Sequence, residues 1–436
     1  MPMSRTQTKN DRHETAAAIF HTNNAPPMNR RKVFPALRRF LAWMAALFVP
    51  FKKRRKLLRH NLLEMRPFTD RRTWNRLIAR KSNKKRALIV EPNAYHAVLL
   101  PGLAALFADL SFDVTVLTLP SNHEQNAFAR VPNRPELCSL PPSLIAKYLK
   151  EHAGGYDAVL LTTTVWTQVS PGRLPPYIDY FNLRAEARRN FLLLEHELND
   201  VAKLGEEEFL RRNRLVALTA FPGAPDALAV CPHYFGDIAV TPKNHGVTRF
   251  IIVGSMDAQC RNGKLLLDAV QNLHEKNVRN FEIVVVGSGR FIVNPSELRR
   301  YFVLRGPLDF PDMYDEMERA DFFLALLDPT DDKHLPYRTA KTTGSRLLVL
   351  GFRKPFVINE LFAAPYEFDE RNAVVYSGNE LAAAMERAVN MDENGYTQMQ
   401  NELGELAEAV RQRSSANLRR ALGETVSMND NDVKAA

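Results

Sequence analysis

The chain has 436 residues, of which 45% are hydrophobic, so it is long enough for two or three domains with substantial cores. This hydrophobic content is ordinary for a globular protein and argues against a bundle of membrane-spanning helices. The three cysteines, Cys138, Cys231 and Cys260, lie far apart and form no CxxC pair. That pattern favours a reducing compartment, and we expect a cytoplasmic protein.

The net charge of +10 is concentrated at one end of the chain. Residues 1–86 hold 23 Lys and Arg against 4 Asp and Glu, whereas residues 87–436 hold 36 against 45. The basic charge therefore belongs to an N-terminal arm. The mildly acidic remainder argues against nucleic acid as a partner of the body of the protein.

The arm begins with residues 1–29, whose richness in Asn, Thr and Pro predicts a disordered lead-in. Residues 30–85 form a basic segment in which apolar residues recur every three or four positions from Phe34 to Phe51, the spacing of an amphipathic helix. Twelve uncharged residues separate Arg39 from Lys52, whereas a membrane span needs about 20. The segment is therefore too short to cross a bilayer.

We expect this helix to lie in the plane of an anionic membrane surface. A helix docked on the body with its charges in solvent, and a basic arm for nucleic acid, are the alternatives. On the membrane interpretation, the residues in contact with lipid include Phe40, Trp43, Phe48, Lys52, Lys53, Arg54 and Arg55.

Residues 86–240 alternate strand-like and helix-like runs. "RALIVEP", "AVLLPGLAALFADLS" and "FDVTVLTLP" make one βαβ unit, and the runs starting at Tyr156, Asn190 and Asn213 continue the pattern. The sequence therefore predicts an α/β domain with a parallel sheet, which we interpret as an N-terminal Rossmann-like domain.

Residues 241–390 repeat the alternation, starting with the strand "RFIIVGS" at Arg249. A Pro- and Gly-rich stretch from Phe221 to Gly246 joins the halves, and residues 391–436 form a C-terminal helix and tail. We expect two Rossmann-like domains that face each other across a cleft, because ligands of such sheets bind outside the carboxyl ends of the strands.

Candidate phosphate-binding residues follow three strands of the second domain. Glycines at a strand end let a ligand approach the backbone, and basic residues at a helix start can hold phosphate oxygens beside the positive end of the helix dipole. Hydroxyl residues before an apolar helix can form an anion-binding nest, although an ordinary helix cap is the alternative. The candidates are Gly254, Ser255, Arg261, Lys264, Gly287, Gly289, Lys341, Thr342, Thr343, Gly344 and Ser345.

The stretches "FIIVGSMDAQCRNGKLLLDAV", "FEIVVVGSGR", "YFVLRGPLDFPDMYDEMERADFFLAL" and "TTGSRLLVLGFRKPFVIN" resemble the nucleotide-sugar-binding domain of GT-B fold glycosyltransferases of the "group 1" type. The resemblance runs from about residue 249 to 359, and the N-terminal half matches in architecture. It implies that residues 86–240 form the acceptor domain. It implies that Arg261 and Lys264 contact the diphosphate of the sugar donor. The two glutamates that such enzymes usually carry are absent, since their positions fall near Lys341 and Leu347.

Two histidines in the first domain are candidate catalytic residues. His96 lies in the loop after the first strand, and His196 ends the run "LLLEH". A histidine at a strand end can act as a general base because its pKa lies near working pH, and the resemblance implies such a role for a histidine that faces the cleft. A hydrogen-bonded structural histidine is the alternative at both positions.

Three aspartates, Asp328, Asp331 and Asp332, follow a strand in "LLDPTDDKH". We interpret them as a polar loop and expect no metal, because the resemblance implies that basic residues and helix dipoles hold the diphosphate.

Together these features predict a metal-independent glycosyltransferase with no cofactor, whose co-substrate is a nucleotide-diphosphate sugar. Its partners would be a lipid-linked or cell-envelope glycan acceptor and the inner face of the cytoplasmic membrane. The alternatives are a nucleotide-sugar epimerase of the same fold and a non-catalytic GT-B-like subunit, which the missing glutamates would explain.

Overall fold

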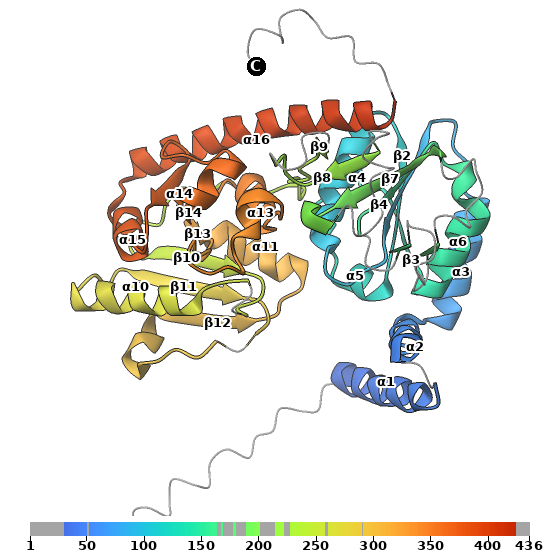
Figure 1. Cartoon of the computed structure of the whole chain (residues 1–436), viewed down its shortest axis with the longest axis horizontal. Helices are drawn as coiled ribbons and strands as arrows, with labels where there is room; N and C mark the ends of the chain where they lie inside the picture. Colours follow the sequence, from blue (N-terminus) through green and yellow to red (C-terminus); the bar gives the residue numbers. More distant parts are fainter. Residues whose placement is uncertain are drawn as a thin grey trace, which may run out of the picture. The chain divides into compact units, whose positions relative to one another are not determined.

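The computed structural model describes residues 30–49, 52–163, 167–168, 178–179, 189–200, 214–221, 227–257, 260–289 and 291–423 (Figure 1). The lead-in predicted for residues 1–29 lies outside this range. The chain divides into two compact units, residues 1–63 and residues 64–436.

The described residues of the N-terminal unit form α1 (Arg30–Leu47) and most of α2 (Lys52–Glu64). Among residues 39–47 of α1, whose side chains are described, the buried ones are the small Ala42 and Ala46. None of the described helices combines the length and the apolar character that a membrane crossing requires. Six large apolar side chains in and just after α1 are exposed, namely Phe40, Leu41, Trp43, Met44, Leu47 and Phe48.

The second unit contains two parallel sheets. The first has the strand order β3-β2-β1-β4-β7-β8-β9, and every described pairing in it is parallel. Buried aliphatic runs such as "ALIV" explain these strands, because both faces of the sheet are covered. The strands are β1 (Arg86–Glu91), β2 (Asp113–Thr118), β3 (Glu136–Ser139), β4 (Ala158–Leu161), β7 (Phe191–Glu195), β8 (Leu215–Ala217) and β9 (Leu228–Ala229).

The second sheet has the order β12-β11-β10-β13-β14-β15, again with parallel pairings throughout its described strands. Both sheets thus follow the Rossmann order 3-2-1-4, so the two predicted Rossmann-like domains are confirmed. The strands are β10 (Thr248–Val253), β11 (Phe281–Val286), β12 (Phe302–Gly306), β13 (Phe322–Leu324), β14 (Phe356–Asn359) and β15 (Ala373–Tyr376). A separate two-stranded pair joins β5 (Thr167–Gln168) to β6 (Ile178–Asp179).

Helices cover the sheets, and several begin with proline in the first turn, where its missing N–H costs nothing. In the first domain they are α3 (Pro67–Ala79), α4 (Leu100–Asp109), α5 (Pro120–Glu124) and α6 (Pro142–His152). In the second they are α10 (Gly263–Glu275), α11 (Phe310–Arg319), α12 (Pro336–Thr339), α13 (Ser345–Phe352), α14 (Glu360–Ala363) and α15 (Leu381–Asn390). Short 3₁₀ turns are η1 (Ala97–Leu99), η2 (Ala153–Gly155), η4 (Leu198–Asp200), η5 (Ser296–Tyr301) and η6 (Ala364–Tyr366).

The C-terminal helix α16 (Glu393–Ala421) joins the two domains (Figure 1). It starts beside the second sheet and packs along its length against α13, then against α4, β8 and β9 of the first domain. Val410 and Leu418 of α16 share one buried cluster with Phe107 and Val216 of the first domain. The helix is therefore part of the first domain's core as well as of the second domain.

Candidate functional site

Both sheets change strand order at their first strand, where chain connections leave in opposite directions. These switch points lie between β1 and β4 in the first sheet and between β10 and β13 in the second. Ligands of open α/β sheets bind at the carboxyl end of such a point. We therefore look for ligand-binding residues in the loops that follow these strands.

At the first switch point, the structure brings His96 and His196 together. Their rings stack with centroids 4.0 Å apart and planes at 21°. Beside them lies Glu91, the last residue of β1, whose Oε2 is 3.8 Å from His96 Nδ1. The sequence analysis missed Glu91, because a glutamate at a strand end resembles an ordinary polar terminus.

Glu91 is fully buried, and hydrogen bonds fix both of its carboxyl oxygens. The Asn93 N–H donates to Oε1 over 2.6 Å, and Thr162 Oγ1 donates to Oε2 over 2.7 Å. Burial raises the pKa of Glu91 to about 8, although these two hydrogen bonds act in the opposite direction. Burial, together with the neighbouring His196, lowers the pKa of His96 to about 3. His96 is therefore neutral at pH 7.

His196 is held in one tautomer. Its Nε2 lies 2.8 Å from the carbonyl oxygen of Thr162. Because a carbonyl can only accept, Nε2 carries the proton and the Nδ1 lone pair is the basic site. Burial lowers the pKa of His196, which keeps the ring neutral. A neutral imidazole with a fixed lone pair is suited to accept a proton from a hydroxyl group.

The loop that carries His196 is hydrogen-bonded to the second domain. The Thr342 N–H donates to the carbonyl of His196 over 3.1 Å, and Leu198 N–H donates to Ala340 O over 2.9 Å. Lys341 Nζ also lies 3.2 Å from Glu197 Oε2. Burial opposes the charge on Lys341, but Tyr337 and Glu197 outweigh it and raise its pKa. One of the two candidate histidines is thus directly bonded to the predicted anion-binding segment, Lys341 to Ser345.

Four backbone donors of that segment already have partners, and the Lys341 N–H donates to Pro336 O over 2.8 Å. Besides Thr342, the Thr343 N–H donates to Tyr366 OH over 3.3 Å, and the Ser345 N–H donates to Thr343 Oγ1 over 3.3 Å. Helix α13 then begins at Ser345. Its N-cap residue is Gly344, which has no side chain to cap the helix. What the segment offers an anion is therefore chiefly the dipole at the start of α13 and the hydroxyl groups.

Arg261 lies beneath this segment and is only 8% exposed. Its Nη1 donates to Ser255 O over 2.8 Å, and its Nη2 donates to Val253 O and, over 3.4 Å, to Ser345 Oγ. Among the described residues it has no ion pair with an acidic side chain. Burial lowers the pKa of Arg261, but a guanidinium remains charged at neutral pH. The site therefore contains a buried positive charge that no described carboxylate neutralises.

Lys264, the other basic residue that the resemblance singles out, does not join Arg261. Its side chain is 83% exposed and pairs with Asp268 over 2.5 Å on the surface of α10. It lines a cavity of about 350 Å³ that also includes Asn262, Asp328 and Thr330. The structure thus separates the two residues, with one buried at the switch point and one on an outer surface.

The three aspartates after β13 do not converge. Asp328 accepts hydrogen bonds from Asn262 and Thr330, and Asp331 accepts one from the backbone of Lys333. No group of three potential metal ligands occurs among the residues that the structure describes.

The glycines at the strand ends allow two loops of the protein to approach each other. Gly254 and Gly287 have φ angles of 117° and 144°, and a Cβ on Gly287 would lie 1.9 Å from the carbonyl oxygen of Gly254. Gly289 has a φ of 103°, and Met256 N–H donates to the carbonyl of Ser288 between the same loops. Their observed role is therefore packing of backbone on backbone, and a ligand contact stays a prediction.

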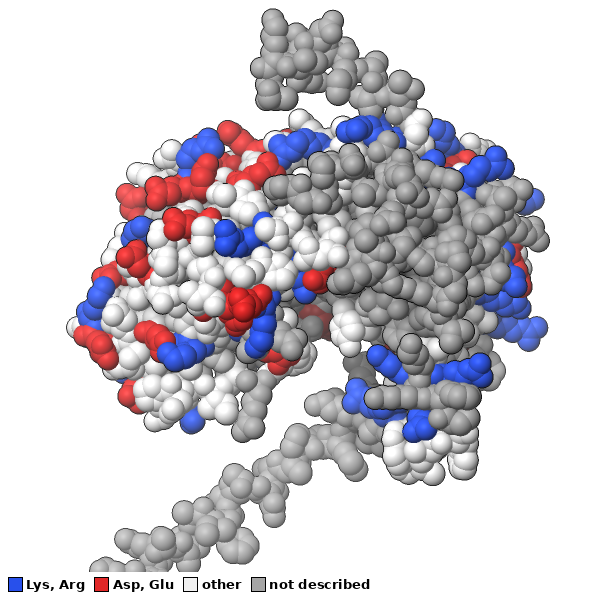
Figure 2. Space-filling model, in the orientation of Figure 1, with Lys and Arg blue, Asp and Glu red and all other residues white. Residues whose placement is uncertain are grey.

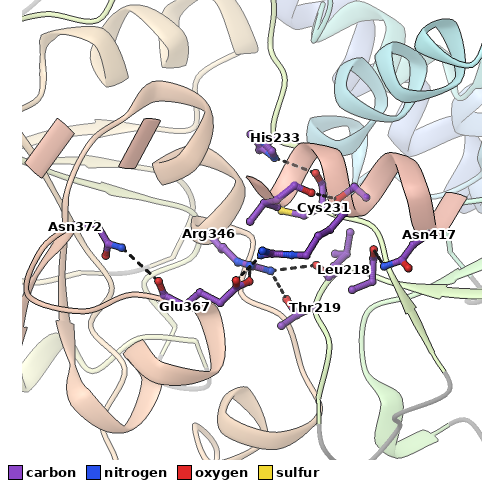
Figure 3. Close-up of polar contacts among 12 residues, drawn as sticks. Leu218, Thr219, Cys231, His233, Arg346, Glu367, Asn372 and Asn417 are labelled. Carbon is purple, nitrogen blue, oxygen red and sulfur yellow. Dashed lines mark hydrogen bonds and ion pairs between the residues drawn. The ribbon is translucent and has the colours of Figure 1, made fainter. Parts of the chain in front are cut away.

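A second buried arginine, Arg346, connects the domains, and the sequence analysis missed it (Figure 3). From α13 its guanidinium donates to Thr219 Oγ1 over 3.2 Å in the first domain and to Glu367 Oε1 over 2.9 Å in the second. Arg413 of α16 donates to the other oxygen of Glu367. Arg346 therefore has an acidic partner, which it shares with Arg413, whereas Arg261 has none among the described residues.

The same region connects α16 to β9 and to the residues that follow it (Figure 3). Ser414 Oγ accepts from the Cys231 N–H over 2.9 Å, and Asn417 Nδ2 donates to Ala229 O over 2.9 Å. His233 Nδ1 lies 3.0 Å from the carbonyl oxygen of Cys231 and is the donor of that pair. These contacts hold residues 229–231 against α16.

No protein-family model matches the chain, and no curated protein matches it. Solved structures do resemble it. WaaG, a glycosyltransferase involved in lipopolysaccharide biosynthesis, is 14% identical, with 78% of this chain and 100% of WaaG covered and a TM-score of 0.42. AviGT4, a glycosyltransferase involved in avilamycin A biosynthesis, is 15% identical, with coverages of 78% and 99% and a TM-score of 0.45. A putative UDP-N-acetylglucosamine 2-epimerase from Listeria monocytogenes is 13% identical, with coverages of 79% and 99% and a TM-score of 0.44.

Proposed function

We propose that the protein is a glycosyltransferase that moves a sugar from a nucleotide-diphosphate donor to a hydroxyl group of a lipid-linked or cell-envelope glycan. The observation that carries the proposal is the buried Arg261, hydrogen-bonded to Ser345 and without an acidic partner among the described residues. An uncompensated buried charge is costly, and an anionic ligand at the start of α13 offsets that cost. The diphosphate of a nucleotide sugar is such an anion.

In this mechanism the two domains have different tasks. We call His96 and His196 of the first domain the first half-site, and Arg261 with the start of α13 in the second domain the second half-site. His196 Nδ1 accepts the proton of the acceptor hydroxyl while the oxygen attacks the anomeric carbon of the sugar. The bond from that carbon to the diphosphate breaks, and the leaving oxygens gain charge beside Arg261 and the dipole of α13. His96 stacks on His196 and holds its ring plane. No step in this scheme needs a cofactor or metal.

The proposed location is the inner face of the cytoplasmic membrane. Helix α1 exposes Phe40 and Trp43, the turn after it exposes Phe48, and α2 exposes Arg54 and Arg55. Blue basic side chains gather on this part of the molecule in Figure 2. The side chains of Lys52 and Lys53 lie outside the described residues. An exposed apolar face beside a dense set of cations fits the boundary of an anionic bilayer. Changing Phe40, Trp43 and Phe48 to Ser should strongly weaken flotation with anionic vesicles, and flotation equal to that of the wild type would contradict a lipid contact by this face.

Thermal unfolding in the presence of UDP, GDP, ADP and CMP and their sugars tests the donor site. A ligand at about 100 times its Kd stabilises the native state by about 2.7 kcal/mol, which is seen as a selective rise in Tm. We expect Arg261→Met to lose that rise and Arg305→Met, on an exposed arginine of the same domain, to keep it. A chain that responds to none of these compounds would be a non-catalytic subunit. Interconversion of the free nucleotide sugar without acceptor would instead identify an epimerase.

A further inference from the structure

A small surface patch of the second unit combines apolar and cationic side chains at the start of α3. Phe68 is 90% exposed, Met65 is 37% exposed, and Arg71 and Arg72 are also exposed. Phe68, Arg71 and Arg72 lie on one face of the helix, because residues three and four apart are neighbours. We call Met65, Phe68, Arg71 and Arg72 the α3 corner.

Contacts at both ends of α3 fix the corner relative to the first sheet. At its start, Arg66 pairs with Glu124 of α5 over 2.8 Å, and the Ser121 N–H donates to Glu64 over 3.0 Å. At its end, Arg80 pairs with Asp113, the first residue of β2. Since α5 follows β2, helix α3 runs antiparallel to the strands. The α3 corner therefore lies at the carboxyl edge of the sheet.

That edge is also the one that carries the candidate histidines. Asn122 of α5 donates to the carbonyl of Asn93 over 2.7 Å, which joins α5 to the loop of His96. Tyr95 in this loop is 83% exposed. The α3 corner and an exposed aromatic residue thus flank the same edge as His96 and His196.

The charges of the α3 corner favour an anionic partner. Arg71 and Arg72 have no ion pair among the described residues, whereas the nearby acids are occupied. Glu124 is paired with Arg66, and Asp70 is buried, where it accepts a hydrogen bond from the Arg66 N–H over 2.7 Å. The chain also runs without interruption from the α3 corner back into α2, the helix that exposes Arg54 and Arg55. Two cations beside an exposed phenylalanine suit the headgroup region of an anionic bilayer, where the cations contact lipid phosphates and the ring enters the apolar boundary.

We propose that the α3 corner is a second contact with an anionic bilayer, distinct from the helices of the N-terminal unit, and that it turns the carboxyl edge of the first sheet toward the lipid. This inference rests on the proposed function and deepens it. An edge that faces the bilayer presents His196 to hydroxyl groups close to the membrane plane. The substrate class is therefore an acceptor that is itself anchored in the bilayer by a lipid.

The test places a fluorescent reporter on the full-length chain. Phe68→Cys carries a polarity-sensitive dye in a Cys260→Ser background, since Cys138 and Cys231 are buried. The control reporter is at Ile292→Cys, a position 54% exposed in the second domain. We expect vesicles of phosphatidylglycerol and phosphatidylcholine to shift the emission of the Phe68 reporter to the blue and to leave the control unchanged. Pure phosphatidylcholine should shift neither.

A charge variant measures the contribution of the α3 corner. Each cation near an anionic surface contributes about 1 kcal/mol, or about fivefold in affinity, so Arg71→Gln with Arg72→Gln should weaken vesicle binding about 30-fold. The matched control is Arg419→Gln with Arg420→Gln, another adjacent exposed pair on a helix, with less than a twofold effect expected.

Three outcomes would overturn the inference. They are an unchanged Phe68 reporter on vesicles that bind the chain, an equal response of the Ile292 reporter, and the absence of vesicle binding. The thermal response to nucleotides is measured without vesicles. A chain that keeps that response but fails the reporter test would retain the proposed donor site and lose the proposed orientation.

Discussion

The two sheet domains share one strand order but equip the equivalent edge differently. At the first switch point, the buried Glu91 and the half-buried His96 and His196 have pKa shifts that favour their neutral forms. At the second, Arg261 is a buried cation. The comparison teaches that a common backbone leaves the chemistry open, because the loops after the strands carry it. In the proposed transfer of a sugar from a diphosphate to a hydroxyl group, a neutral base accepts the hydroxyl proton and a fixed cation stabilises the leaving diphosphate.

The largest expected effect comes from removing the base of the first half-site. We expect His196→Ala to lower the rate of nucleotide release from the donor sugar, in the presence of acceptor, about 10²- to 10⁴-fold, because general base catalysis contributes that much. Donor binding in the thermal assay should stay unchanged, since the donor belongs to the other half. His245→Ala, on an exposed histidine, is the control. A variant with normal turnover would assign His196 a structural role.

The connection between the halves is the next target. Arg346→Met removes the buried guanidinium that donates to Thr219 and to the half-exposed Glu367, and hydrogen bonds from a charged group contribute about 1.5 to 3 kcal/mol. The midpoint of urea unfolding should fall accordingly. Arg305→Met, which removes the half-exposed partner of Glu316, should cost less than about 1 kcal/mol. Equal effects of the two variants would show that Arg346 does not hold the domains together.

Glu91 gives a dependence on pH whose sign follows from its raised pKa. The folded pKa is about 8 and the ordinary value 4.5, so the folded state binds the proton more tightly than the unfolded state. The stabilisation from Glu91 is complete below pH 4.5, declines as the pH rises and is lost above about 8. The Tm of Glu91→Gln relative to the wild type should therefore increase between these limits. A difference that stays constant with pH would mean that Glu91 is ionised in the folded protein.

The smallest effect separates the two basic residues of the second half-site. Lys264→Met removes an exposed side chain that pairs with Asp268, and such pairs contribute less than about 1 kcal/mol. We expect nucleotide affinity to change less than about fivefold, in contrast to Arg261→Met. A loss as large as that of the Arg261 variant would place Lys264 on the diphosphate.

The sequence was sufficient to predict both sheets because their central strands are continuous aliphatic runs, as in "ALIV" and "EIVVV". It placed His96, His196 and Arg261 at strand ends for the same reason. Short edge strands such as β3 and β9 carry no such run. Their strand state comes from pairing with a neighbour, which no local pattern records.

The charged residues that the sequence analysis missed share a physical cause. Glu91 and Arg346 are buried, yet their residue types are mostly found on surfaces. Their burial depends on partners far away in the chain, such as Thr162 for Glu91 and Thr219 for Arg346. Lys264 is the opposite case. The resemblance placed it at the ligand, but its side chain is exposed on the surface, because a position in a motif gives no information about exposure.

Helix α16 has a consequence for how the protein is made. Synthesis runs from the N-terminus, yet the first domain is completed by Val410 and Leu418 and by the Ser414 hydroxyl bonded to Cys231. Until the ribosome has released residues 410–418, part of the core around Phe107 and Val216 lacks its cover. The first domain therefore emerges early and reaches its final packing last, and a chain that stops before α16 would expose that core to chaperones and proteases.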